Sequence, residues 1–191
     1  ENYGAISTIY DNINSHVDYV AWADFFEKCF DLHLANRPEL VLDLACGTGK
    51  MTRELSSRGY DMIGVDGSEQ MLSVACDGNY DEDLNKIHEI LYLLQDMRSF
   101  ELYGTVDAAI CCLDSINYLT SARDVQRTFQ RLHLFVAPGG LLVFDINSVE
   151  KLRGLDGQAF LDETDDIYCV WRTEFDKRSK ICSYGMDIFT R

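Results

Sequence analysis

The stretch VLDLACGTGK, residues 41–50, decides the fold of this chain. Val41 to Leu44 form an apolar run with one acid, typical of a buried parallel strand, and a turn of small residues, Ala45 to Gly49, follows directly. Glycine lets the backbone approach a ligand closely, and a helix that starts after the turn aims its free N–H groups at the same point. The stretch predicts a strand–turn–helix cradle for a nucleotide, although a tight turn without a ligand has the same pattern.

A second acidic residue supports the nucleotide interpretation. The next apolar run, residues 62–65, ends in Asp66, and Gly67-Ser68 opens another helix, which Ser68 can cap. In a βαβ unit, an acid about 20 residues beyond the glycine turn is placed to accept hydrogen bonds from ribose hydroxyls. We therefore expect Asp66 to bind the ribose of a nucleoside.

Together these motifs resemble the class I S-adenosylmethionine-dependent methyltransferases, whose first motif looks like VLDLACGTG and whose second strand ends like IGVDGS. The turn differs from the dinucleotide fingerprint G-x-G-x-x-G, because position 45 is alanine and Thr52 stands where a third glycine belongs. The base that a nicotinamide oxidoreductase needs, such as a Tyr-Lys pair, does not appear either. The resemblance favours methyl transfer over hydride transfer, and a catalytically inactive nucleotide-binding module of the same fold stays an alternative.

The end of the third predicted strand carries the expected adenine contacts. The apolar run of residues 90–94 is followed by Gln95, Asp96 and Met97. In the family an acid just after this strand accepts a hydrogen bond from the adenine amine, and an ionised carboxylate suits that amine because it can only accept. The resemblance implies this role for Asp96, with the Met97 backbone beside the ring, and a plain loop carboxylate is the alternative.

The methionine half of the cofactor is expected near the ends of the first and fourth strands. Asp43 lies among apolar neighbours, where a carboxylate needs partners. In the family the corresponding acid orders the glycine loop near the methionine amino group, and bonding loop N–H groups without ligand contact is the alternative. Residues 106–113 predict the fourth strand. Ligands sit beyond the carboxyl ends of parallel strands, so residues 113–118, with Leu113 and Asp114 first among them, should floor the methionine half or face the acceptor.

The N-terminal region resembles a narrower group. The run YDNINSHVDYVAW, residues 10–22, is similar to the N-terminal segment of small-molecule methyltransferases of the glycine N-methyltransferase group, where such aromatic residues close over cofactor and substrate. This resemblance implies contacts for Tyr10, Tyr19 and Trp22. The sequence also predicts a helix here with an apolar stripe that packs on the sheet, formed by Trp22, Phe25, Phe26, Cys29 and Leu32.

The resemblance therefore implies S-adenosylmethionine as the cofactor. A dedicated general base is not required, because positioning of two reactants can supply much of the rate of an in-line displacement. We name no catalytic residue, and Asp114 is only a candidate base. The expected cofactor contacts are Tyr10, Trp22, Asp43, Ala45, Cys46, Gly47, Gly49, Asp66, Gly67, Ser68, Met71, Gln95, Asp96, Met97, Leu113 and Asp114.

Composition restricts the acceptor. Acidic residues outnumber basic ones by 32 to 17, which gives a net charge of −15. Such a chain repels a phosphate backbone, because sequence-independent nucleic-acid affinity comes from Lys and Arg. We expect no nucleic-acid substrate and no binding to an anionic membrane surface. The acceptor that remains is a small, uncharged or cationic molecule, whose identity the sequence leaves open together with the oligomeric state.

Cysteine and histidine usage indicates the compartment and the absence of a metal. The seven cysteines are an odd number without a C-x-x-C pair, and the four histidines show no ligand spacing. We expect free thiols in a reducing cytosol and no metal site. The chain shows no signal peptide and no apolar run of membrane-spanning length, so we expect a cytoplasmic protein.

Alternating βα units with short connections predict an α/β fold, a doubly wound and mostly parallel Rossmann-like sheet. A helix after residue 121 should end at Pro138-Gly139-Gly140, and the fifth strand should begin at Leu141. We expect residues 1–147 to form the S-adenosylmethionine-binding domain and residues 148–191 to form a lid-like extension of it.

The extension has β character. Residues 167–175 and 181–189 are rich in β-formers, and the polar residues 176–180 between them suit a hairpin. This resembles the antiparallel insertion that several small-molecule methyltransferases carry after the fifth strand. The family normally adds two more strands to the main sheet after that insertion, so we expect the chain to be truncated.

Overall fold

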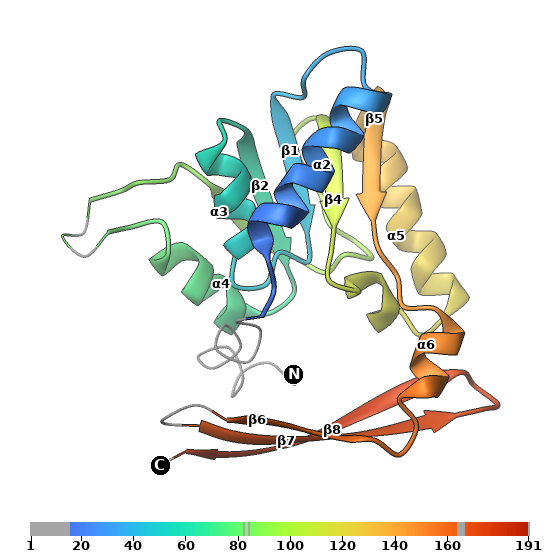
Figure 1. The fold of residues 1–191 in the computed structure, drawn as a ribbon. Coiled ribbons are helices and arrows are strands. Elements are labelled where there is room, and N and C mark those ends of the chain that lie inside the picture. Colours follow the sequence, from blue (N-terminus) through green and yellow to red (C-terminus); the bar gives the residue numbers. More distant parts are fainter. Residues whose placement is uncertain (1–15, 82, 84, 164–166, 191) are drawn as a thin grey trace.

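The computed structural model describes residues 16–81, 83, 85–163 and 167–190, so the predicted contact Tyr10 lies outside the described residues. Helices and strands alternate through the first part of the chain, and strands dominate the last part (Figure 1). In order, the elements are α2 (Tyr19–His33), β1 (Leu40–Leu44), α3 (Lys50–Ser57), β2 (Asp61–Asp66), α4 (Glu69–Asp77), β3 (Leu91–Leu94), β4 (Val106–Cys111), η1 (Ser115–Tyr118), α5 (Ala122–Phe135), β5 (Val136–Phe144), α6 (Val149–Gly154), β6 (Ala159–Glu163), β7 (Ile167–Asp176) and β8 (Ile181–Thr190).

The main sheet is parallel, with the strand order β3-β2-β1-β4-β5. The chain winds outward from β1 to β3, then returns to place β4 on the other side of β1. The direction of winding therefore reverses between β1 and β4. Ligands of open α/β sheets bind outside the carboxyl ends of the strands at such a reversal. The predicted doubly wound fold is confirmed, and it places a candidate site at the ends of β1 and β4.

Two apolar layers cover the sheet, because α2 crosses one face and α5 lies behind the other (Figure 1). The first layer packs Phe26 of α2 against Val41 of β1, and the second packs Leu132 of α5 in the same cluster as Leu42. Successive side chains of a strand point to opposite faces. Asp43 therefore shares the face of Val41 and points toward the side on which α2 and α3 pack.

The predicted apolar stripe of α2 is wrong in part. Phe26 is fully buried, but Phe25 is 50% exposed and Leu32 is 78% exposed. The buried stripe consists of Ala23, Phe26 and Phe30, at i, i+3 and i+7. A helix with apolar residues around much of its circumference offers more than one stripe, so the packing partner decides which one is buried.

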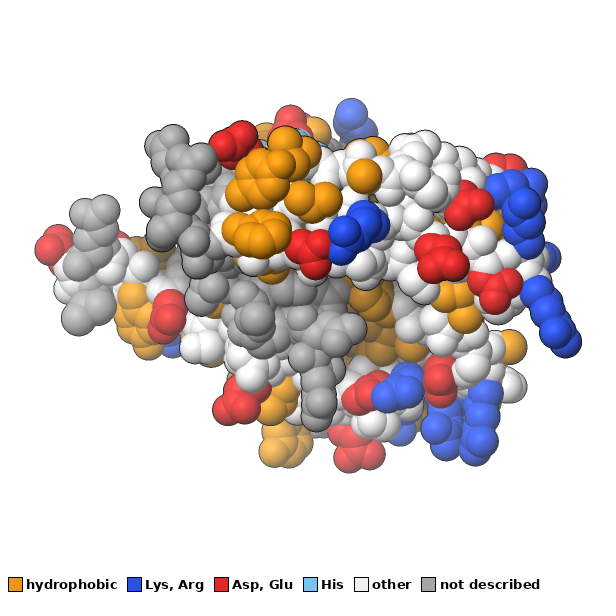
Figure 2. Space-filling model, turned by 90° about the horizontal axis from the view of Figure 1, so that it is seen from below, with side chains coloured by type: hydrophobic (Ala, Val, Ile, Leu, Met, Phe, Trp, Pro, Cys, Tyr) orange, Lys and Arg blue, Asp and Glu red, His pale blue; other side chains and the backbone are white. Residues whose placement is uncertain are grey.

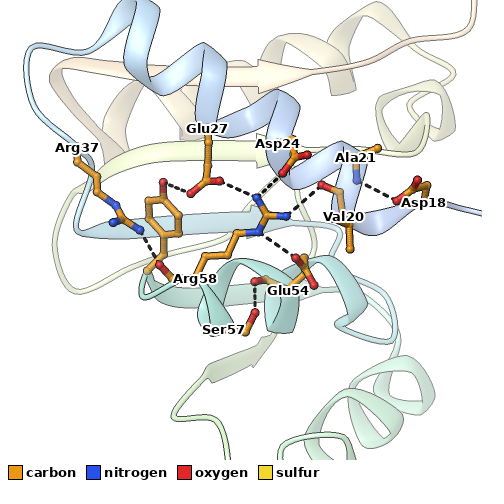
Figure 3. Close-up of polar contacts among 10 residues, drawn as sticks. Asp18, Val20, Ala21, Asp24, Glu27, Arg37, Glu54, Ser57 and Arg58 are labelled. Atoms are coloured by element: carbon orange, nitrogen blue, oxygen red, sulfur yellow. Dashed lines mark hydrogen bonds and ion pairs between the residues drawn. The ribbon is translucent and has the colours of Figure 1, made fainter.

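Arg58, just after α3, joins α2 to α3 (Figure 3). Its guanidinium contacts Asp24 at 2.7 Å, Glu27 at 2.6 Å and Glu54 at 2.9 Å, and it also donates to the Val20 carbonyl oxygen at 3.1 Å. The arginine side chain is only 19% exposed, so these contacts are shielded more than those of an open surface pair. They hold the first three turns of α2 beside α3.

The fifth strand begins earlier than predicted. β5 follows α5 without a loop and contains Pro138-Gly139-Gly140, where the prediction had placed a helix end. Gly139 has a φ of +86°, and the pairing register shifts opposite this region between Val106 and Ala108. A bulge of this kind admits glycine backbone conformations into a strand. The composition of Pro138-Gly139-Gly140 correctly indicates that a helix cannot continue through these residues. It does not show that the chain pairs with β4 from Val136 onward.

The predicted hairpin is confirmed as β7 and β8, and an unpredicted strand, β6, completes an antiparallel sheet. This sheet follows α6 and lies on the side of the molecule where the strands of the parallel sheet end (Figure 1). Paired residues of antiparallel strands share a face, so Tyr184 lies on the face of its partner Thr173, which is buried. The opposite face carries the ring pair Tyr168–Phe189 and an Arg172–Asp187 ion pair.

Seen from below, hydrophobic side chains gather over one part of the molecule, while Lys and Arg side chains gather toward one end (Figure 2). In the sequence, the connection between β7 and β8 carries three basic residues, Lys177, Arg178 and Lys180. The strongly acidic chain therefore has a local basic region.

Candidate functional site

A small hollow lies at the reversal point of the parallel sheet. Its walls come from the start of α2, the turn after β1, the first turn of α3 and the residues after β4. Of the predicted cofactor contacts, the residues that line it are Asp43, Ala45, Cys46, Gly47 and Leu113. The sequence analysis also suspected Tyr19 and the segment 113–118, which contains Ser115, but it did not name Thr48, Lys50, Met51 or Cys112 as a contact. Proximity to the recognised motifs is the sequence signal that could have identified these four.

The turn after β1 is built on three left-handed residues: Ala45, Gly47 and Gly49 have φ angles of 63°, 56° and 75°. The Ala45 N–H donates to the Val65 carbonyl oxygen at 2.7 Å, which fixes the turn to β2. A Cβ atom at Gly47 would meet nothing within 4 Å, whereas one at Gly49 would collide with the Tyr92 hydroxyl. Glycine thus serves backbone conformation at the first position and close packing at the second.

Asp66 at the end of β2 is hydrogen-bonded to the glycine turn. Its Oδ2 accepts from the Gly47 N–H at 2.8 Å, and its Oδ1 accepts from the Ser68 N–H at 2.8 Å. Burial raises the pKa of Asp66, while these backbone N–H groups act in the opposite direction. An ionised carboxylate has about four acceptor sites, so this one can still accept from a ligand hydroxyl. The two motifs recognised in the sequence therefore meet at one point.

Asp43 is a buried carboxylate with an incomplete set of partners. It is 1% exposed, and its Oδ2 accepts from the Thr52 hydroxyl at 2.6 Å. Its Oδ1 has no hydrogen-bond partner among the described residues. Burial raises the pKa of Asp43 to about 7, the Thr52 hydrogen bond lowers it, and Asp66 raises it further. A buried oxygen of this kind is suited to a ligand that brings a donor or a positive charge.

Four other predicted contacts do not line the hollow and lie around the start of α4 or in α2. Gly67 separates Asp66 from Ser68, and the Ser68 hydroxyl caps α4 by accepting from the Met71 N–H at 3.3 Å. The Met71 side chain is buried in the protein interior. Trp22 packs against the rings of Phe25 and Phe26 within α2 and is not among the residues that line the hollow.

The residues after β3 bond within their own loop. Asp96 accepts from the Arg98 Nε at 2.8 and 3.0 Å and from the Arg98 N–H at 2.8 Å, and Arg98 lowers the pKa of this carboxyl. The Gln95 side chain accepts from the Glu101 N–H at 2.6 Å. Met97 packs beside the second core layer. None of the three lines the hollow, although the Gln95 N–H donates to the Asp66 carbonyl oxygen and brings this loop beside Asp66.

A polar cluster joins the ends of β4 and β5. The Asp114 N–H donates to Asp145 at 3.0 Å, and Asn147 Nδ2 donates to Asp114 Oδ2 at 2.9 Å. Leu113 and Asp114 both have left-handed backbone, with φ of 57° and 53°. Burial, and then the charge of Asp145, raise the pKa of Asp114. The sequence prediction named Asp114, while Asp145 and Asn147 enter the cluster only through tertiary structure.

Tyr184 of β8 belongs to the same neighbourhood and was missed by sequence analysis. Burial raises its pKa to about 12, with further contributions from Cys182 and from the charge of Asp114. The antiparallel sheet therefore approaches the end of β4. The alternation of Cys182, Tyr184 and Met186 in the sequence could have shown that the tyrosine shares a face with apolar neighbours, but not which face it is.

Known protein families and solved structures include proteins that are similar to this chain. Residues 41–140 match the family described as "Methyltransferase domain". The chain is similar to a solved S-adenosylmethionine-dependent methyltransferase from Clostridium acetobutylicum, with a TM-score of 0.81 and 32% identity, over 100% of this chain and 76% of that one.

Among curated proteins, the putative methyltransferase YqeM of Bacillus subtilis is 35% identical over 175 residues, 90% of this chain and 66% of that protein. A glycine/sarcosine N-methyltransferase of Parasynechococcus marenigrum is 29% identical over 152 residues, 78% of this chain and 51% of that protein. The 18S rRNA (guanine-N(7))-methyltransferase bud23 of Schizosaccharomyces pombe is 33% identical over 128 residues, 61% of this chain and 44% of that protein. The chain thus spans two thirds or less of the length of these curated relatives.

Proposed function

This chain belongs to the methyltransferase-domain family of S-adenosylmethionine-dependent enzymes, and on that premise we propose that the whole protein methylates a small, uncharged or cationic acceptor. S-Adenosylmethionine is the cofactor of this family, and it supplies a methyl group activated by a positively charged sulfur. The role of the protein is then to hold cofactor and acceptor in line and to exclude water.

The residues of the hollow fit this cofactor. The glycine turn leaves open space at Gly47, where a ligand can approach the backbone. The unpartnered Asp43 Oδ1 suits the ammonium group of the methionine half. Asp66 can accept from ribose hydroxyls while it keeps its two backbone bonds. For Asp96 we retain the adenine role as a proposal, and it requires the carboxylate to share its oxygens between Arg98 and the adenine amine.

One observation carries the cofactor assignment: the Asp66 carboxylate and the glycine turn are joined at 2.8 Å at the reversal point of the sheet. The test is calorimetric titration with S-adenosylhomocysteine, with NAD as the comparison ligand. Asp66→Ala should weaken binding by about 1–3 kcal/mol, the scale for removing a partner from buried polar groups. Asp61→Ala, at the exposed opposite end of β2, is the matched control. Equal affinities of the wild type and Asp66→Ala would refute the ribose assignment.

The small acceptor is supported by charge and by the antiparallel sheet. A net charge of −15 opposes binding of a phosphate backbone. The sheet brings Tyr184 near Asp114 at the end of β4, where a lid over an acceptor would be needed. We propose that residues 148–191 are this lid-like extension and that small molecules, rather than nucleic acids, reach the methyl group. All seven cysteines are free thiols, which supports a reducing cytosol as the site of action.

The acceptor class is tested by methyl transfer from labelled S-adenosylmethionine. We expect label to enter small uncharged or cationic molecules and not rRNA or tRNA at physiological salt. The bud23 relative and the basic β7–β8 connection define the opposing outcome, which is salt-sensitive RNA binding together with methyl incorporation into RNA.

Among the described residues, no helix combines the length and apolarity needed to cross a bilayer.

A further inference from the structure

The start of α2 forms one wall of the hollow. Tyr19, the first residue of α2, lines the hollow together with the glycine turn and the first turn of α3. The Asp18 carboxylate caps α2 by accepting from the Ala21 N–H at 2.9 Å. The cap fixes the residue at which the helix begins. Contacts with neighbouring elements must fix where this beginning lies relative to the hollow.

Arg58 supplies such a contact one residue away from this wall. It directly follows α3, which begins at the glycine turn, and its guanidinium donates to the Val20 carbonyl oxygen at 3.1 Å (Figure 3). Val20 is the chain neighbour of Tyr19. The same guanidinium contacts Asp24 at 2.7 Å and Glu27 at 2.6 Å, both on α2. One side chain at the end of α3 therefore holds three positions of α2.

The balance of charge around Arg58 makes this connection dependent on one cation. Glu54 of α3 adds a third carboxylate, 2.9 Å from the guanidinium. Without the cation, the two carboxylates of α2 would face the one of α3, and like charges at short range repel each other. The repulsion would push the start of α2 away from α3, and Tyr19 would move with it.

Resting on the cofactor assignment above, we propose that Arg58 is a positioning residue for the ligand site, which sets how closely Tyr19 approaches the glycine turn and thereby how tightly the cofactor binds. Arg58 itself is not among the residues that line the hollow, so it acts on the ligand through Tyr19. Indirect positioning of this kind has a large effect, because a displacement of about 1 Å in a site can remove much of its efficiency.

A double-mutant cycle distinguishes this role from a purely structural one. If Arg58 acts through Tyr19, replacing Arg58 should have little effect on the affinity once the Tyr19 ring has been removed, because the two effects share one cause. A residue that only stabilises the fold lowers the melting temperature and leaves the dissociation constant of the folded protein unchanged.

The experiment measures calorimetric dissociation constants of S-adenosylhomocysteine for the full chain, at fixed salt and well below the melting temperature of every variant. Arg58→Met and Tyr19→Leu should each weaken binding about fivefold or more, the scale of coupled contacts. In the Tyr19→Leu background, Arg58→Met should change the affinity by less than about twofold. Arg58→Lys should recover part of the affinity, because lysine keeps the charge but not the planar set of donors.

Arg37→Met is the matched control. Arg37 follows the end of α2, donates to the Arg58 carbonyl oxygen at 2.6 Å and lies 4.3 Å from the centre of the Tyr60 ring. It holds the same connection between α3 and β2 without contacting the start of α2. Its loss should lower the melting temperature and leave the dissociation constant within about twofold of the wild type.

The outcomes separate this proposal from the cofactor assignment. Unchanged affinity in Arg58→Met or in Tyr19→Leu, or equal weakening by Arg58→Met in both backgrounds, overturns the role of Arg58. If Arg58→Met does not fold, Glu27→Gln, which neutralises the partner at 2.6 Å, takes its place in the same cycle with the same deciding outcomes. Failure of the wild type to bind S-adenosylhomocysteine refutes the cofactor assignment itself.

Discussion

Asp43 shows at the residue scale how burial prepares a site. The carboxylate lies in a strand with apolar neighbours and receives one hydrogen bond, from Thr52. Burial raises its pKa from 3.8 to about 7, because a charge with too few partners is costly in the interior. The thiols of Cys46 and Cys112 also have raised pKa values, chiefly through burial, so they stay neutral beside it. A cationic ligand group would relieve this cost.

The raised pKa predicts a pH-dependent stability. The unfolded chain ionises Asp43 near pH 4, whereas the folded protein holds the proton until about pH 7. The folded state therefore binds more protons in this window, so the contribution of Asp43 to stability is greatest below about pH 4 and is lost as the pH rises to about 7. Asp43→Asn should gain stability relative to the ligand-free wild type between pH 5 and pH 8. Urea unfolding of both proteins at these pH values measures it.

Asp66, whose pKa is raised as well, is present in both proteins, so the difference between the two profiles reports the loss of the Asp43 carboxyl together with its coupling to Asp66. Parallel pH profiles for wild type and Asp43→Asn would show that Asp43 does not titrate in this window. With S-adenosylhomocysteine present, the wild type should recover stability at pH 8, because the ligand ammonium then partners the ionised carboxylate.

At the element scale, Tyr92 couples β3, β2 and the glycine turn. Gly64 of β2 pairs with Tyr92 in the sheet, and a Cβ atom at Gly64 would lie 2.5 Å from Cδ1 of the tyrosine ring and 2.9 Å from the Cys46 sulfur. The same ring reaches Gly49 in the turn. Two glycines therefore make room for one aromatic side chain. The Tyr92 ring packs against Gly64, and its hydroxyl packs against Gly49 of the turn. Burial raises the pKa of Tyr92.

Gly64→Ala should therefore destabilise the fold by about 1–3 kcal/mol, the usual cost of adding a methyl group to a packed core. The double variant Gly64→Ala with Tyr92→Leu should recover part of this loss, because the smaller side chain vacates the space. Gly154→Ala in α6, where a Cβ atom meets nothing within 4 Å, is the control and should be neutral or slightly stabilising. Thermal or urea unfolding measures all three, and a neutral Gly64→Ala would contradict the packing argument.

At the scale of the whole molecule, the two sheets have separate cores. The parallel sheet has two apolar clusters, one on each face, and the antiparallel sheet has its own small cluster around Cys169. The charge of Asp114, beyond the end of β4, contributes to the raised pKa of Tyr184 in β8. This arrangement suits an extension that covers a site without supporting its fold.

A chain that ends at residue 147 should therefore fold. We expect cooperative thermal unfolding and an affinity for S-adenosylhomocysteine within about threefold of the full chain, because an independent hydrophobic core is what a domain requires. Methyl transfer to the acceptor should be lost. Circular dichroism and calorimetry measure the first two properties. A shortened chain that melts without cooperativity would show that residues 148–191 are part of the folding unit.

The sequence by itself determined the local features of this protein. The run from Val41 to Gly49, the acid at Asp66, the cap at Ser68 and the hairpin around residues 176–180 were all predicted, and the structure contains each of them. These features depend on backbone propensity, turn chemistry and short periodicity. Such information lies within a few residues of the position that it describes.

The tertiary structure alone decided which distant side chains meet. The pairing of strands places Asp43 and Lys50 around one hollow, brings Tyr184 toward Asp114, and turns the Asp96 carboxylate to Arg98. Packing also selected the buried stripe of α2 and drew Pro138-Gly139-Gly140 into β5. The physical reason is that strand register and face selection follow from contacts between segments far apart in the chain, and no local pattern records those contacts.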